Sequence, residues 1–177
     1  MYDKRLTFAH SQDQLIELLL ELYREVDSRL LELHGLHEDR LACRPGCSSC
    51  CIDGITVFDI ESLNIIRAYP ELLRESSPHP EGFCAFLDGV GCCRIYEHRP
   101  YVCRTQGFPL RWIDERPDGS FVEMRDICPL NDTGAEVETL EKEACWTIGE
   151  FEYRLRQLQE SLGSGSLKRV SLRRLFQ

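Results

Sequence analysis

Two stretches of the chain place apolar residues three or four positions apart, which is the spacing of an amphipathic helix. In the first stretch, Ser11 and Gln14 form a capping-box pattern, and Gly35 supplies a stop. We therefore predict a helix over about residues 12–34. Its apolar positions are Leu15, Leu19, Leu22, Val26, Leu30 and Leu33.

The second stretch lies near the other end of the chain and is followed by Gly163. Its spacing predicts another long helix, over about residues 136–162. The two helices are expected to pack on each other or on the segment between them. The apolar positions of the second are Val137, Leu140, Ala144, Ile148, Phe151, Leu155, Leu158 and Leu162.

The pattern between the helices is shorter and less regular. The stretch "ITVFDIESLNIIRAYPELL" predicts a short strand and then a helix capped at Asp59. Apolar runs on both sides of Asp88-Gly89, and again around Pro117–Gly119, predict two hairpins. We expect a small α+β fold, with a cysteine-rich core of irregular and hairpin structure over about 43–129 between two long helices.

Length and composition indicate one domain, over residues 1–163. The chain has 177 residues, and its 42% hydrophobic content is enough for a core without disulfides. Residues 164–177 form a tail with four basic residues and no acidic one. We expect this tail to be flexible, or alternatively to contact a protein partner.

Charge and hydropathy exclude several classes of partner. There are 30 acidic and 21 basic residues, a formal charge of −9, which argues against nucleic-acid binding through a broad basic face. No apolar run approaches the roughly 18 residues of a membrane span. The first residues lack the apolar centre of a secretion signal, so we expect a cytoplasmic protein.

The ten cysteines are the candidate chemistry of this chain. Eight of them fall within 43–51 ("CRPGCSSCC") and 84–103. Disulfides, metal ligation and inert buried thiols are the three explanations. Cytosolic thiols are kept reduced, and inert thiols would be scattered along the chain, so metal ligation is favoured.

The spacing in the first cluster suits a metal but leaves its arrangement open. Cys47 and Cys50 are separated by two residues, which lets a tight turn present two sulfurs to one ion. Cys50 and Cys51 are adjacent, and neighbouring side chains usually diverge. The doublet therefore indicates two sites, one cluster of several metals, or a ligand beside a spectator. Zinc and iron–sulfur clusters both use four thiolates, so the metal stays undecided.

"CRPGCSSCC" followed by "CAFLDGVGCCRIYEHRPYVCR" resembles the YkgJ-like family of zinc- or iron-chelating proteins, which carry a CxxCxxCC signature. The likeness extends to a cysteine before proline, Cys128-Pro129, and covers roughly residues 43–129. One relative in this family is a flagellin lysine methylase, but no glycine-rich cofactor loop supports that chemistry here. The metal ligands that the resemblance implies are Cys43, Cys47, Cys50, Cys51, Cys84, Cys93, Cys103 and Cys128.

Some cysteines depart from the family pattern, and several nearby residues have more than one possible role. Three residues separate Cys43 from Cys47, where the signature has two, and Cys92 could take the place of Cys93. Cys145 fits a small buried thiol on the second helix. His98 is either an additional ligand or solvent-facing. The arginines near cysteines could donate to sulfur or pair with carboxylates; they are Arg44, Arg94, Arg99 and Arg104.

The sequence thus predicts a metal-binding protein that holds zinc or an iron–sulfur cluster. One interpretation is a structural or interaction module organised by zinc. The alternative is an iron–sulfur-dependent enzyme or a redox or electron-transfer protein. No nucleophile motif or phosphate loop identifies catalytic residues.

Overall fold

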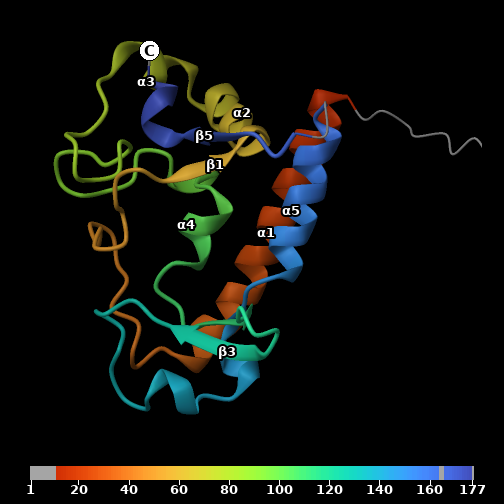
Figure 1. Ribbon diagram of the computed structural model, residues 1–177. Coiled ribbons are helices and arrows are strands. Elements are labelled where there is room, and N and C mark those ends of the chain that lie inside the picture. The colour runs from red at the N-terminus through yellow and green to blue at the C-terminus, as the bar shows by residue number, and fades with distance from the viewer. Residues whose placement is uncertain (1–10, 164–165, 177) are drawn as a thin grey trace, which may run out of the picture.

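The structure is a computed structural model that describes residues 11–163 and 166–176. Two helices, α1 (Gln12–Leu36) and α5 (Glu150–Ser161), run side by side along one flank of the molecule (Figure 1). Small sheets and short helices complete a mixed architecture that confirms the predicted α+β class. The remaining elements are β1 (Thr56–Phe58), α2 (Asp59–Ala68), α3 (Pro70–Glu75), η1 (Tyr96–His98), α4 (Tyr101–Thr105), β2 (Leu110–Glu115), β3 (Phe121–Asp126), η2 (Val137–Thr139), η3 (Lys142–Ala144), β4 (Trp146–Thr147), β5 (Arg169–Ser171) and η4 (Leu172–Leu175).

Helix α1 forms as its apolar spacing predicts. The Ser11 hydroxyl accepts the Gln14 amide at 3.2 Å, and the Gln14 side chain accepts the Ser11 amide at 2.8 Å, so the capping box is complete. All six predicted apolar positions are buried, together with Ile16 and Tyr23. This buried stripe faces α5 and α4 and forms the main hydrophobic cluster.

The predicted helix over 136–162 was wrong in its first half. That part of the chain forms η2, η3 and β4, and α5 begins only at Glu150. Gly149, at φ 142°, has a backbone conformation that would interrupt a continuous helix. Strand β4 instead pairs in parallel with β2 and buries Trp146, so tertiary pairing outweighs the helical spacing.

The two predicted hairpins differ in extent. Strands β2 and β3 pair in antiparallel register over six residues each, which confirms the hairpin around Pro117–Gly119. Around Asp88-Gly89 the hairpin is reduced to one bridge, between Leu87 and Cys93. The predicted cap of α2 is displaced by one position, because Phe58 precedes the helix and Asp59 is its first residue.

The flexible tail predicted for 164–177 was wrong for residues 166–176. Strand β5 pairs antiparallel with β1, and Leu172 and Leu175 are buried. Lys168 forms an ion pair with Asp59 at 3.2 Å, so this basic residue of the tail is paired within the molecule. The tail is ordered because its apolar residues complete a core and its cations meet carboxylates. The protein-partner contact suggested for this tail stays a prediction.

A second hydrophobic cluster lies apart from the α1 stripe and includes Phe86, Ile95 and Leu172. Cys84 is part of this cluster, and Cys51 and Cys93 pack against it. The structure therefore places several cysteines against apolar side chains rather than in open loops. Within the described ranges, no helix has the length and apolar character needed to cross a membrane.

Candidate metal centre

All ten cysteines lie in the described part of the chain and are free thiols. The eight predicted ligands divide by their surroundings into two groups. We call the first the inner group: Cys51, Cys84, Cys93 and Cys103. We call the second the outer group: Cys43, Cys47, Cys50 and Cys128.

Backbone pairing brings the first two inner cysteines together. The Cys84 amide donates to the Cys51 carbonyl at 2.9 Å, and the next residues form an isolated bridge, Ile52 with Phe83. These contacts join two segments that are more than thirty residues apart in the sequence. The reduced hairpin then returns the chain, through its Leu87–Cys93 bridge, to the third inner cysteine.

Helix α4 supplies Cys103 and is anchored by buried charges. The Glu61 carboxylate accepts the Tyr101 amide and the Tyr23 hydroxyl, each at 2.9 Å. Arg104 is buried, pairs with Asp27, and donates to two backbone carbonyls. Because Glu61 is hydrogen-bonded and Arg104 is both ion-paired and hydrogen-bonded, these two side chains fix α4 against α1 and α2.

The inner thiols affect one another electrostatically. Burial is the largest cause that raises the pKa of Cys84, of Cys93 and of Cys103. The thiols of Cys84 and Cys93 raise the pKa of Cys103 further, and so do the Glu61 carboxylate and the thiol of Cys50. Amide groups two residues onward act in the opposite direction: the Phe86 N–H lowers the pKa of Cys84, and the Ile95 N–H lowers that of Cys93.

The outer group is built on two tight turns between α1 and β1. The Cys47 amide donates to the Arg44 carbonyl at 2.9 Å, and the Cys51 amide donates to the Ser48 carbonyl at 2.9 Å. The Ser49 hydroxyl, in the second of these turns, lies 4.0 Å from the Cys47 sulfur and 3.7 Å from the Cys128 sulfur. Cys128, far along the sequence, thus joins the first cluster.

Asn131 supports the outer group from a fully buried position. Its Nδ2 donates to the Cys43 sulfur at 3.3 Å and to the Gly107 carbonyl at 2.8 Å, while its Oδ1 accepts the Ala42 amide at 2.8 Å. A Cβ at Gly107 would lie 2.7 Å from that sulfur, so only glycine leaves room for it. Burial raises the pKa of Cys43, the Asn131 hydrogen bond lowers it, and the thiols of Cys47, Cys128 and Cys50 raise it.

A hollow of about 460 Å³ opens beside the outer group. Cys47 lines it together with Arg44, two serines and Leu130. The side chain of Cys43 is itself exposed. The outer group is therefore accessible from solvent, whereas the inner group contains Cys84, which is 8% exposed.

The Cys50-Cys51 doublet lies where the two groups meet. A hydrogen bond between the two thiols lowers the pKa of Cys50 and raises the pKa of Cys51. Cys50 also acts on Cys43 and on Cys103, which belong to different groups. Cys51 is influenced by Cys84 and Cys103, both inner residues.

The donor chemistry of both groups fits a thiophilic metal such as zinc or iron. The amide N–H groups directed at Cys84 and Cys93, and the Asn131 amide at Cys43, are the donors that stabilise metal-bound thiolates. Arg94 lowers the pKa of the same two inner thiols, and its buried Nε has no hydrogen-bond partner among the described residues. In that part of the chain, however, no three His, Cys, Asp or Glu side chains are already placed to hold an ion.

The donors to sulfur are not the arginines that the sequence suggested. Arg94 donates to the Ser77 and Ala85 carbonyls, and Arg104 is occupied by Asp27 and carbonyls. Asn131 was missed because nothing in a lone asparagine after "CPL" marks it as a neighbour of Cys43. Only the fold brings these residues, 88 positions apart, into contact.

Three further candidates lie outside both groups. Cys145 is buried, but it precedes β4 rather than lying on a helix as expected, and its sulfur accepts a hydrogen bond from Arg125 at 3.2 Å. His98 contacts Asn64 at 3.1 Å and packs edge-on against Tyr69. Cys92 is half-buried, and its backbone closes the turn at Asp88.

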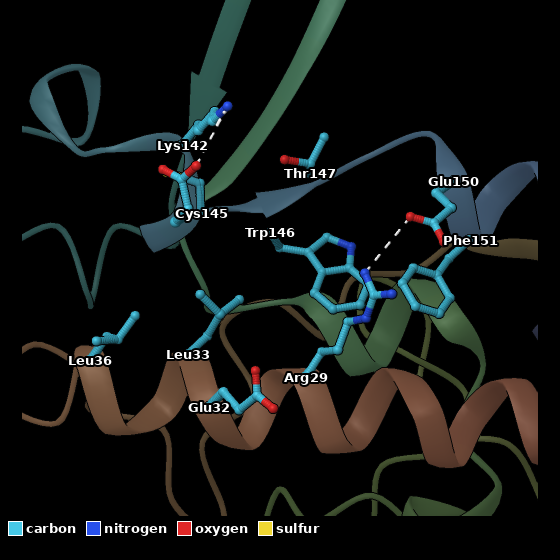
Figure 2. Close-up of a pocket in the computed structure, with 11 residues that line it drawn as sticks. Arg29, Glu32, Leu33, Leu36, Lys142, Cys145, Trp146, Thr147, Glu150 and Phe151 are labelled. Atoms are coloured by element: carbon cyan, nitrogen blue, oxygen red, sulfur yellow. Dashed lines mark ion pairs between the residues drawn. The ribbon is translucent and has the colours of Figure 1, made fainter.

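Cys145 also lines a separate hollow of about 390 Å³ between α1 and the start of α5 (Figure 2). Trp146 and Phe151 also line it, and Arg29 forms an ion pair with Glu150 at 3.7 Å. None of the eight predicted ligands lines this hollow. It is therefore no part of the candidate metal centre.

The sequence profile of one protein family, CxxCxxCC, described as "Putative zinc- or iron-chelating domain", matches residues 42–129. The match includes every residue of the inner and outer groups. It excludes α1, Asn131, α5 and the C-terminal segment. No curated protein and no solved structure matches the chain significantly.

Proposed function

Residues 42–129 belong to the CxxCxxCC family, and from this premise we propose that the protein binds two metal ions or clusters, each through four cysteine thiolates. The inner group forms one centre and the outer group forms the other. The observation that supports this proposal is the contact between distant segments beside the thiols: the Cys84 amide donates to the Cys51 carbonyl, and the Ser49 hydroxyl lies near the sulfurs of Cys47 and Cys128.

The division follows the mutual influence of the thiols. Cys43 is affected by Cys47, Cys128 and Cys50, which are the other three members of the outer group. Burial has the largest effect on the pKa of Cys103; among the thiols, the inner residues Cys84 and Cys93 raise it more than the outer residue Cys50 does. Four thiolates complete the closed coordination of a structural zinc or a simple iron–sulfur centre.

The doublet is then explained by assigning its two members to different centres. The two thiols are hydrogen-bonded to each other in the structure, and binding at different centres would separate them, because one ion rarely accepts two adjacent side chains. Cys50 lies in the turn from Ser48 to Cys51, directly after Cys47, while Cys51 is tied through its carbonyl to Cys84. Metal binding would draw each set of sulfurs to ligating distance and release the protons of the thiols.

An iron–sulfur protein that transfers electrons is a second candidate, and one observation favours it. The doublet joins an accessible group directly to a buried one, which would connect solvent to an interior centre. We propose a cytoplasmic location for the protein in both cases, because thiols that bind metal have to stay reduced.

The test is anaerobic purification followed by elemental analysis and a visible spectrum. Two zinc ions per chain and no colour would support zinc, whereas iron with labile sulfide and broad visible absorption would support the second candidate. Cys103→Ser and Cys47→Ser should each remove one centre, and the control Cys145→Ala should remove none. Cysteines that are paired as disulfides in the native, metal-free protein would overturn both.

A further inference from the structure

The C-terminal segment, residues 166–176, lies outside the matched family domain but packs against the inner group. We call this segment the clasp. Leu172 and Leu175 are buried in the cluster that contains Cys84, and the Phe176 ring lies 4.9 Å from the Phe86 ring. Figure 1 shows β5 and the helical turn after it beside β1, at the end of the molecule opposite to β3.

Arg173 is the polar centre of the clasp. Its Nε and Nη2 donate to the two carboxylate oxygens of Asp53, at 3.0 and 2.8 Å. The same guanidinium donates to the carbonyls of His79 at 2.7 Å, Phe83 at 2.8 Å and Pro80 at 3.3 Å. One side chain therefore joins three segments of the chain.

The groups that Arg173 holds are direct neighbours of inner cysteines. Asp53 is two residues after Cys51, and Phe83 immediately precedes Cys84. Asp53 also accepts the Gly54 amide at 2.8 Å and the Gly82 amide at 3.0 Å, so both loops are tied to one carboxylate. The Cys84–Cys51 backbone bond lies between these anchors.

We infer that Arg173 is a positioning residue for the inner metal centre, setting the distance between Cys51 and Cys84, and that the clasp belongs to the metal-binding module. This inference rests on the proposed function. A guanidinium presents its donors in a fixed planar fork, which matches a carboxylate and nearby carbonyls together. A lysine would keep the charge but lose this geometry.

The test compares Arg173→Gln and Arg173→Lys with Arg174→Gln, a change at the neighbouring arginine, which is exposed. Zinc affinity is measured by competition with a chromophoric chelator, and the geometry of thiolate ligation by the visible bands of the cobalt-loaded protein. We expect both changes at Arg173 to weaken one of the two sites by about 10- to 100-fold, as for other residues that orient metal ligands. Arg174→Gln should bind as the native protein does.

Hydrogen exchange at the Cys84 amide, measured without metal, separates this inference from the proposed function. Faster exchange in both Arg173 variants, but not in Arg174→Gln, would support the positioning role even if the native protein bound no metal. Unchanged exchange and unchanged affinity in Arg173→Lys would overturn it. Because lysine keeps the charge, that variant remains informative if Arg173→Gln fails to fold.

Discussion

The inner and outer groups contain the same number of thiols in contrasting surroundings. Cys84 is part of a hydrophobic cluster, with Cys51 and Cys93 packed against it, whereas no outer cysteine belongs to either cluster. Cys43 is exposed, and Cys47 lines an open hollow. In the proposed function, identical ligand chemistry would serve two physical settings: a centre built into the core and a centre near the surface.

The contrast extends to the groups that support the sulfurs. Inner thiols face amide N–H groups of their own turns, from Phe86 and Ile95, and are surrounded by apolar side chains. The outer Cys43 depends on a side chain from another segment, Asn131. Loss of the inner centre should damage the fold, while loss of the outer centre should leave it largely intact.

The largest expected effect is on stability. Cys103→Ser should lower the free energy of unfolding of the metal-loaded protein by about 4 kcal/mol or more, because loss of a structural metal is among the few changes that reach this size. Cys47→Ser should cost about 1 kcal/mol, the central value for single substitutions. Denaturant unfolding at fixed free metal measures both, with Cys92→Ser as the control. Equal losses for the two variants would remove the distinction between a core centre and a surface centre.

The next effect concerns the doublet that links the two groups. Cys50→Ser and Cys51→Ser should each lower metal content by one centre, and the double variant by two, because the two thiols serve different centres. Stopped-flow removal by a chelator identifies which centre remains: the exposed outer metal should leave quickly and the shielded inner metal slowly. Cys50→Ser should therefore lose the fast phase and Cys51→Ser the slow one. Unchanged metal content in Cys51→Ser would make that thiol a spectator.

How much of this arrangement the sequence predicts depends on the distance over which each feature acts. Helix α1 was predicted because its cap and its apolar stripe are local. The stretch before α5 has a similar stripe, but pairing of β4 with β2, contributed from elsewhere in the chain, decides its structure. The tail was taken for a flexible end because its basic residues dominate its composition. Its partners Asp53 and Asp59 lie more than a hundred positions away.

The same limit applies to the candidate site. Motif order predicted the eight cysteines as a set. The proposed division into two groups needed the fold, because the Ser49 hydroxyl lies near both Cys47 and Cys128, and the backbone joins Cys51 to Cys84. The Arg173–Asp53 pair also links segments 120 residues apart, and no sequence pattern indicates it.

A smaller effect should appear in the pH dependence of the metal-free protein. Burial raises the pKa of Cys84, Cys93 and Cys103, so the folded state keeps these protons longer than the unfolded state does. Stability from a raised pKa is present below the unfolded value, about 8.5 for a thiol, and is lost as pH rises through the folded value. Unfolding by urea should therefore become easier from about pH 8 to 10 in metal-free protein. Cys84→Ser should reduce the dependence of unfolding free energy on pH more than Cys47→Ser does. An equal dependence in the two variants would contradict the conclusion that burial raises the pKa of the inner thiols.

The smallest expected effect tests the support of the outer group. Asn131→Leu keeps the branched shape of the side chain but removes the donor to Cys43 and leaves the Ala42 amide and Gly107 carbonyl without their partner. An unsatisfied buried group costs about 1–3 kcal/mol, so some loss of stability is expected whatever the metal does. The result that tests the hydrogen bond to Cys43 is metal affinity. The outer metal, which leaves quickly, should bind about tenfold more weakly, which is the smaller loss seen when a residue that orients a metal ligand is changed.

Asn64→Leu is the matched control for Asn131→Leu. Asn64 is nearly as buried, but its side chain hydrogen-bonds to His98 and not to a sulfur. It should change stability through the loss of its bond to His98 without weakening the outer metal. If both variants change outer affinity alike, the effect of Asn131 is general destabilisation and the hydrogen bond to Cys43 has no separate role. If only Asn131→Leu does so, the outer centre near the surface depends on a buried residue beyond the family domain, as the inner centre depends on the clasp.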